Sequence, residues 1–121
     1  MPIIAFPSAG NDENAVLDLR FGRAKNFVLY NENTKTFSVV ENTQNMQASQ
    51  GAGIQSAQNI LDNNASVLIS GNCGPKAFRV LNAAQVQIFF AEAKPIIELL
   101  QDYQQGLLKK AESANTEGHW V

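Results

Sequence analysis

Three short runs of apolar residues constrain this sequence more than any other feature. The runs are PIIAF at residues 2–6, ASVLIS at 65–70 and VQIFFA at 86–91. Each is short, apolar and rich in β-branched or aromatic residues, which is typical of strands buried on both faces. Three segments have apolar residues at helical spacing. Segment 53–63 precedes the second run, 74–84 lies between the second and the third, and 94–112 follows the third. This alternation predicts parallel strands with helices on both faces of the sheet.

Residues 26–42 follow a different pattern, in which apolar residues alternate with polar ones. Phe27 and Leu29 are two positions apart, as are Phe37 and Val39, with NENTK between the pairs. The pattern predicts a β-hairpin with a longer, Asn-rich turn. Together with right-handed crossovers, the hairpin predicts an α/β fold with a five-stranded mixed sheet of order 3-2-1-4-5, in which strand 2 is antiparallel.

Signals at the ends of the predicted helices refine their limits. Ser49 or Gln50 is placed to open the first helix. Pro75 falls in the first turn of the second, where its missing N–H costs nothing. Gly106 weakens or ends the third.

Length and composition exclude several classes of protein. We expect one domain over residues 1–112 and a flexible tail over 113–121, because 121 residues fit a single domain. A net charge of -2 argues against a general nucleic-acid binder. The single cysteine indicates a reducing, cytoplasmic compartment. The N-terminal segment has no basic region and too short an apolar stretch for a signal peptide or membrane span.

Unusual segments follow the predicted parallel strands. In an open α/β sheet, ligands bind outside the carboxyl ends of these strands. The four segments there carry RFGRAK within 7–25, QGAG within 42–53, SGNCGPK from residue 70 and AEAKP at 91–95. Their coincidence predicts a binding site at this edge of the sheet.

Two of these segments suit an anionic ligand. In SGNCGPK, glycines allow close backbone approach, and the following helix start favours negative charge. Cys73 there is either a thiolate that binds a soft metal or a small buried residue in a tight turn. In RFGRAK, the cations Arg20, Arg23 and Lys25 either bind an anion or form a solvated basic turn.

Signatures of catalysis are missing from the sequence. It contains no GxGxxG, Walker loop, HExxH or CxxC motif, and its one histidine, His119, lies beside Trp120 in the predicted tail. Carboxylates at Asp12, Glu13, Asp18 and Glu92 could approach the same edge, although solvated loop acids are the simpler interpretation.

Several segments in the same order resemble the dinitrogenase iron–molybdenum cofactor biosynthesis family, which includes NifX and the C-terminal part of NifB. They are RFGRAKNFVLY, VVEN, QGAG and ASVLISGNCGPKAFRVLNAAQVQIF. The resemblance covers about residues 2–105 and implies a ribonuclease-H-like fold. It places a cofactor-binding site at Phe21, Gly22, Arg23, Ala24, Gly51, Gly53, Gly71, Asn72, Gly74 and Pro75, with Cys73 as a metal ligand.

The resemblance also implies a function. We expect a non-catalytic carrier for an anionic iron- or molybdenum-containing metal–sulfur cluster or its precursor, with cofactor-assembly proteins as partners and neither nucleic acid nor membrane. One alternative is a ribonuclease-H-type nuclease or phosphoryl-transfer enzyme, but the predicted buried strands carry no Asp or Glu. Another is a regulatory interaction module without a metal cargo. The oligomeric state stays open.

Overall fold

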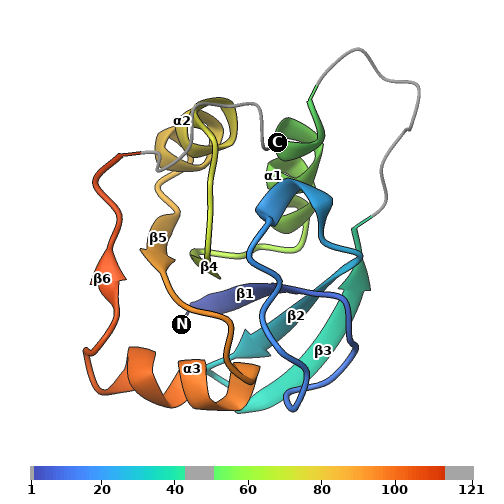
Figure 1. Cartoon of the computed structure of the whole chain (residues 1–121), viewed down its shortest axis with the longest axis vertical. Helices are drawn as coiled ribbons and strands as arrows, with labels where there is room; N and C mark the ends of the chain where they lie inside the picture. The colour runs from blue at the N-terminus through green and yellow to red at the C-terminus, as the bar shows by residue number, and fades with distance from the viewer. Residues whose placement is uncertain (1, 43–50, 114–121) are drawn as a thin grey trace.

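The computed structural model describes residues 2–42 and 51–113, and a mixed sheet runs through its centre. Three helices and a 3-10 turn are attached to the sheet within these residues (Figure 1). In chain order, the elements are β1 Ile3–Ser8, η1 Phe21–Arg23, β2 Asn26–Asn31, β3 Thr36–Glu41, α1 Ala52–Asp62, β4 Val67–Ser70, α2 Pro75–Ala83, β5 Gln87–Phe90, α3 Ile96–Gln104 and β6 Lys109–Lys110.

The sheet has the order β3-β2-β1-β4-β5-β6. Strand β1 pairs in parallel with β4, and β4 pairs in parallel with β5. Strand β2 is antiparallel to both β1 and β3. The predicted order of the first five strands is therefore confirmed, as is the antiparallel direction of the second. The ribonuclease-H-like classification stays a prediction.

The predicted number of strands is wrong, because β6 lies inside the segment 94–112 that was expected to be helical. Helix α3 ends in a Schellman motif: Gly106 N–H donates to Tyr103 O at 3.0 Å, and Leu107 N–H donates to Asp102 O at 2.9 Å. Gly106 takes a φ of +75°, which an L side chain rarely adopts. The chain then turns back, and β6 pairs antiparallel with β5.

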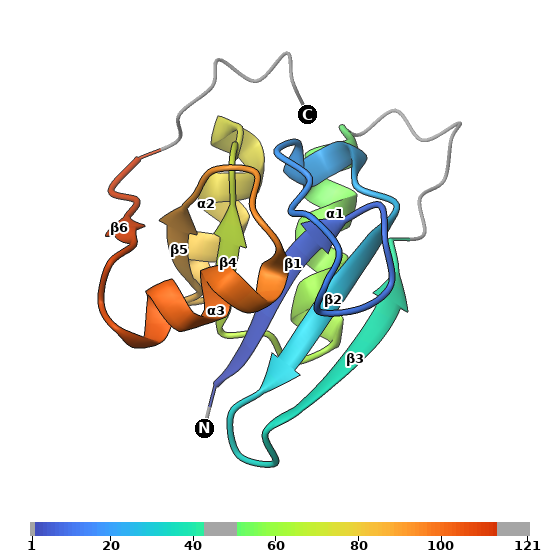
Figure 2. The same cartoon turned by 60° about the horizontal axis from the view of Figure 1, so that its bottom comes forward.

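Helices cover both faces of the sheet, as the alternation of strands and helices predicted. Figure 2 shows α1 and α2 behind the sheet and α3 in front of it. Behind the sheet, Ala57 and Ile60 of α1 pack with Ala77 and Leu81 of α2 in one buried cluster. In front, α3 contributes Ile96, Leu99 and Leu100 to a second cluster. Both apolar faces of the central strands are thereby removed from water.

No helix in the described part of the chain has both the length and the apolar character needed to cross a bilayer. The expected helix-opening residues Ser49 and Gln50 lie outside the described residues, and the residue that precedes α1 is Gly51. Most of the expected tail, including His119 and Trp120, also lies outside them.

Candidate anion-binding rim

The carboxyl ends of β1, β3, β4 and β5 meet at one edge of the sheet, which is the upper edge in Figure 2. Three of the four segments predicted there lie side by side. We call residues 18–25, 51–53 and 71–79 the rim.

The turn η1 sits directly on the start of α1. Gly22 is buried, and a Cβ atom added to it would lie 2.9 Å from Gly53 N and 3.3 Å from Ala52 C. Only a glycine allows the two backbones to approach this closely. The motifs FGRA and GAG, which are about thirty residues apart along the sequence, therefore form one surface.

The same loop also lies against the segment that follows β4. Arg20 and Asn72 form a parallel bridge. A Cβ on Gly71 would lie 2.9 Å from Leu19 Cα, so the backbone here is again close-packed. Ser70 Oγ donates to Asn72 O at 2.9 Å and holds the turn in place. The motif SGNCGP is thus joined to RFGRAK.

The fourth predicted segment, AEAKP, contacts a different part of the loop. Leu17 N–H donates to Lys94 O at 3.0 Å. At the start of α3, Ile96 N–H donates to Ala15 O and Ile97 N–H to Glu13 O, at 2.9 and 2.8 Å. The loop therefore caps α3, and we do not include residues 91–95 in the rim.

The starts of α1 and α2 differ from the start of α3, because each follows a glycine. Gly51 and Gly74 are the N-cap residues, and neither helix has a side-chain cap. Pro75 occupies the first turn of α2, as predicted. Amide groups in the first turn of a helix have no acceptor within the helix and carry a partial positive charge, so they attract anions.

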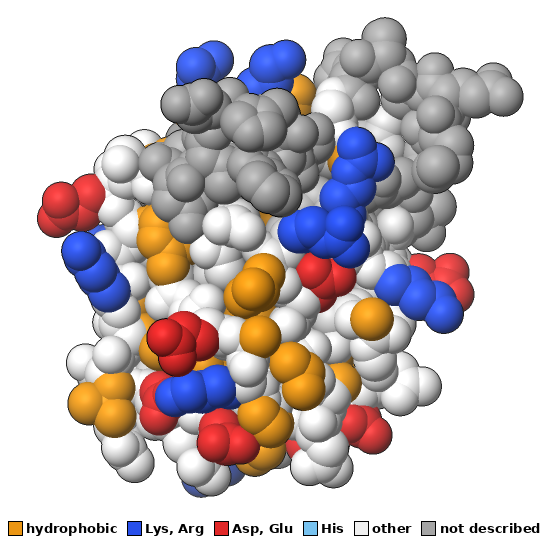
Figure 3. Space-filling view, in the orientation of Figure 1, with side chains coloured by type: hydrophobic (Ala, Val, Ile, Leu, Met, Phe, Trp, Pro, Cys, Tyr) orange, Lys and Arg blue, Asp and Glu red, His pale blue; other side chains and the backbone are white. Residues whose placement is uncertain are grey.

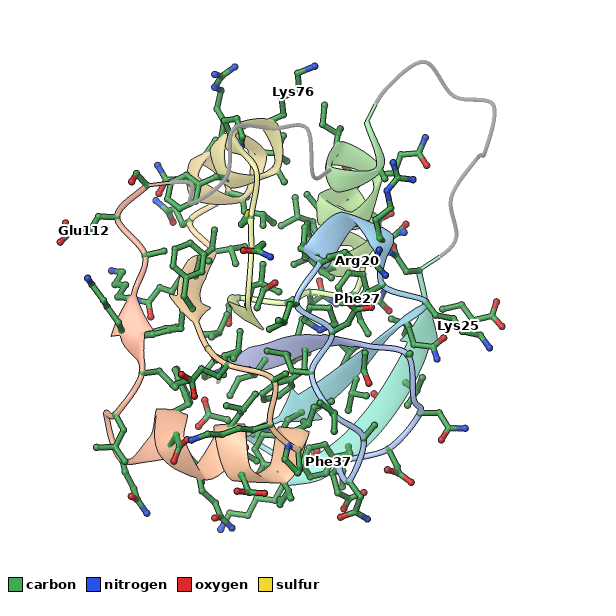
Figure 4. All side chains as sticks on the ribbon, viewed as in Figure 1. Arg20, Lys25, Phe27, Phe37, Lys76 and Glu112 are labelled. Carbon is green, nitrogen blue, oxygen red and sulfur yellow. The ribbon has the colours of Figure 1, made fainter. Side chains whose placement is uncertain are left out.

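Basic side chains surround these two helix starts. The rim holds five of the nine Lys and Arg residues in the sequence and one of its eleven acidic residues, Asp18. All five cations are exposed: Arg20, Arg23, Lys25, Lys76 and Arg79. Figure 3 shows basic side chains over α2 and beside η1. In Figure 4, Arg20 lies beside η1 and Lys76 stands off α2.

One ion pair reduces the charge of the rim slightly. Arg20 Nε lies 3.8 Å from Asp18 Oδ1, and the Arg20 side chain is 57% exposed. A contact of this length and exposure is weak. Although the whole chain is acidic, the rim is therefore a positive surface.

Cys73 lies in the core and not on the rim surface. It is 0% exposed and belongs to the buried cluster behind the sheet. Burial raises the pKa of its thiol to about 12, and Sγ donates to Gly74 O at 3.8 Å. A protonated, buried thiol is a poor metal ligand. The structure therefore favours the buried residue in a tight turn over the thiolate.

Two other predicted site residues also have buried side chains. Phe21 is 1% exposed and packs on Phe27 with ring centroids 5.5 Å apart, and Ala24 is 4% exposed. Figure 4 shows Phe27 in the interior. Phe21 and Ala24 shape the turn, while Arg23 between them is exposed. The side chains of Phe21, Ala24 and Cys73 face the core, and the assignment of these residues to a cofactor site stays a prediction.

The sequence of the chain matches the family described as Dinitrogenase iron-molybdenum cofactor over residues 2–106. The chain belongs to this family. Its match covers η1, α1, α2 and the strands that end at the rim. The resemblance inferred from the motifs is thereby confirmed.

Solved structures of similar proteins share the fold. The apo form of the orange protein from Desulfovibrio gigas is 33% identical, with a TM-score of 0.89 over 96% of this chain and 98% of that protein. A Thermotoga protein described as a candidate NifB protein is 29% identical, with a TM-score of 0.82 over 98% of this chain and all of that one.

The chain is also similar in sequence to an uncharacterized protein of Methanocaldococcus jannaschii. The two are 29% identical over 103 residues, which cover 83% of this chain and 86% of that protein.

The sequence did not reveal three buried polar residues that bond to the loop between β1 and β2, and of these only Asn42 bonds to a rim residue. Ser8 Oγ donates to Val16 O at 2.9 Å, and Asn26 Nδ2 donates to Gly10 O at 3.0 Å. Asn42 is 8% exposed and bonds to Ala24. Each of the three lies at or directly next to a strand end, and a polar residue at such a position is the signal that would have found them.

Acidic residues do not gather into a metal site in the described part of the chain. No group of three or more His, Cys, Asp or Glu side chains lies close enough there to hold a metal ion. Asp12 and Asp18 instead accept hydrogen bonds from the loop backbone, at 2.9 Å each. These two carboxylates therefore stabilise turns of the loop between β1 and β2.

Proposed function

We propose that this protein is a non-catalytic carrier that binds an anionic iron- or molybdenum-containing metal–sulfur cluster, or its precursor, at the rim. The observation that carries the proposal is the meeting of two glycine-capped helix starts with five exposed cations and one acid. We propose residues 1–112 as the domain that binds, with cofactor-assembly proteins in the cytoplasm as its partners.

The chemistry of the rim fits a large anion better than a bare metal ion. Helix amides and guanidinium groups donate hydrogen bonds to negative atoms, including the sulfur atoms of a metal–sulfur anion. A bare cation would instead need a set of carboxylate, imidazole or thiolate ligands. The described residues hold no such cluster.

The relatives support the same proposal. The family is described by the iron–molybdenum cofactor of dinitrogenase. The orange protein from Desulfovibrio gigas, which is 33% identical, has an apo form, and a protein with an apo form has a group that it binds. We propose that the corresponding surface of this chain binds its cargo.

We propose a structural part for Cys73 in this carrier. Its side chain is buried in the core cluster behind the sheet, and its backbone belongs to the turn 71–74 of the rim. The amides and cations then bind the cargo without a covalent bond to the protein. Weak ligation of this kind suits a carrier, because the cargo must also leave.

The nuclease alternative is less well supported. A ribonuclease-H-type reaction needs carboxylates that converge on metal ions, and the described residues hold no group of three acidic, His or Cys ligands. The regulatory alternative would need an apolar interaction surface, whereas the rim is basic and lined by glycine.

An anaerobic titration of the metal-free protein with tetrathiomolybdate tests the proposal. We expect a shift of the visible spectrum and coelution of molybdenum with the protein in gel filtration. Arg23→Gln removes one cation from the rim, and Lys35→Gln is the matched control, because Lys35 is exposed in the hairpin turn at the other end of β3.

We expect Arg23→Gln to weaken binding about tenfold, since a hydrogen bond to a charged group is worth about 1.5 kcal/mol at an exposed site. Lys35→Gln should leave the affinity unchanged. Binding that is absent in the wild type, or equally weakened by the two variants, would contradict a site at the rim.

A further inference from the structure

Asn42, the residue that follows β3, connects the η1 part of the rim to helix α1 through one buried side chain. Its Nδ2 donates to Ala24 O at 2.8 Å and to Ser56 Oγ at 2.9 Å. Its Oδ1 accepts from Asn59 Nδ2 at 2.7 Å. Its backbone N–H donates to Lys25 O at 2.9 Å. One amide group therefore bonds to the end of the η1 turn and to α1 at the same time.

Ser56 of α1 extends this connection to the other side of Arg23. Its hydroxyl is fully buried and donates to Gly22 O at 3.4 Å. The carbonyl groups of Gly22 and Ala24, which flank Arg23 in the sequence, are thus both held by buried side chains. The backbone position of Arg23 relative to α1 is set by these bonds.

This network has a directional requirement that apolar packing lacks. A buried amide with its donors and acceptor used favours one arrangement of the groups around it, because any other leaves polar atoms unpaired. The Gly22 contact with Gly53 keeps the turn close to the helix. The hydrogen bonds of the Asn42 amide also fix the orientation of the turn about that contact.

We propose that Asn42 is a positioning residue for the anion site: it holds the backbone of Arg23 in register with the first turn of α1, so that the guanidinium and the helix amides act on the same anion. The proposal rests on the proposed function of the rim. Asn42 acts through Arg23 and α1, since its own side chain is buried and fully engaged.

The structure offers a matched control in Asn26. Asn26 is 7% exposed and Asn42 is 8% exposed, and each donates from Nδ2 to a carbonyl of the loop between β1 and β2. Asn26 bonds to Gly10, which lies outside the rim. Asn26→Ala and Asn42→Ala therefore both remove a buried amide, but only the second removes the bond to Ala24, the residue that follows Arg23.

The experiment measures the affinity of four anaerobic proteins for tetrathiomolybdate: wild type, Asn26→Ala, Asn42→Ala, and Asn42→Ala combined with Arg23→Gln. We expect Asn42→Ala to weaken binding about tenfold and Asn26→Ala less than twofold. In the Arg23→Gln background, Asn42→Ala should cost less than threefold, because the cation that it positions is gone. Coupling of this kind is what a double-mutant cycle detects.

Two results would overturn the proposal: equal effects of Asn42→Ala and Asn26→Ala on affinity, or an unchanged effect of Asn42→Ala when Arg23 is absent. If Asn42→Ala does not fold, Asn59→Ala removes the bond to Asn42 Oδ1 and keeps the bond of Asn42 to Ala24, and it should show the same pattern with a smaller size.

A second measurement separates this proposal from the proposed function. If the wild type does not bind tetrathiomolybdate, the proposed cargo is wrong, and amide hydrogen exchange of the ligand-free proteins decides the positioning role. We expect Asn42→Ala to accelerate exchange at residues 22–24 and 52–54 at least tenfold relative to Asn26→Ala. Equal exchange in the two variants would show that Asn42 does not hold the turn.

Discussion

The substitution Gly22→Ala tests whether the η1 turn must lie against the start of α1. The added methyl group would lie 2.9 Å from Gly53 N, 3.1 Å from Gly53 Cα and 3.3 Å from Ala52 C. All three are backbone atoms in the first turn of α1, so no side-chain rotation can relieve the contact. Gly22 does not have a positive φ, so alanine brings no conformational strain of its own.

The size of the effect follows from two opposing terms. Overpacking a rigid site costs about 1–3 kcal/mol. Replacing glycine by alanine restricts the unfolded chain and returns about 0.4–1 kcal/mol. We therefore expect a net loss of about 1–2 kcal/mol. At about 2.1 cal/mol/K of unfolding entropy per residue, this lowers the Tm of the protein by about 4–8 °C.

Calorimetry and the tetrathiomolybdate titration together distinguish the causes, with Gly106→Ala as the control. Gly106 has a φ of +75° and open space around its Cα, so alanine there costs about 1–2 kcal/mol through the backbone alone. Gly106 lies in the turn between α3 and β6, away from the rim residues. We expect both variants to lose stability and only Gly22→Ala to lose affinity.

A Gly22→Ala protein as stable as the wild type would refute the reasoning, because it would mean that the start of α1 moves aside without cost. If Gly106→Ala weakened binding as much as Gly22→Ala, the loss of affinity would report stability and not the geometry of the rim.

Three further predictions concern Cys73 and the charge of the rim. Burial raises the pKa of the Cys73 thiol from 9.0 to about 12, so the contribution of this thiol to stability is complete below about pH 9 and is lost as the pH rises toward 12. Urea unfolding between pH 8 and 11 should show this loss in the wild type and not in Cys73→Ala. An identical pH dependence in the two proteins would contradict the prediction. Cys73→Ala should bind tetrathiomolybdate within about twofold of the wild type, since the thiol lies in the core, and loss of the charge-transfer band in this variant would make Cys73 a ligand after all. Raising the salt concentration from 0.05 to 0.5 M shortens the Debye length from roughly 14 to roughly 4 Å. Binding should weaken several-fold if the exposed cations attract the cargo. A salt-independent affinity would contradict a role of these cations in binding.

Most of the fold could be predicted because its signals are local. The apolar runs at 2–6, 65–70 and 86–91 can be buried only as strands between helices, and the alternation at 26–42 defines a hairpin. The observed pairing of β1 with β2 and β4 agrees with both patterns. The sixth strand was missed because two residues, Lys109 and Lys110, carry no periodicity of their own.

The candidate site could be predicted at the level of segments and not of side chains. The rule for the carboxyl ends of parallel strands located the motifs around Gly22, Gly53 and Gly71, and the backbone contacts of Gly22 and Gly71 explain why glycine is needed there. The sequence could not show that the start of α3 lies outside the rim, because the carbonyls of Glu13 and Ala15 that cap this helix come from a distant loop.

The sequence by itself determined the first five strands and the presence of the three helices, and that an unusual concentration of cations and glycines follows the strands. Only the tertiary structure decided that Cys73 faces the core, that Arg23 faces water, and that Asn42 joins the turn to α1. The physical reason is that periodicity depends on neighbours along the chain, whereas burial and hydrogen bonding depend on groups that meet only when the sheet has formed.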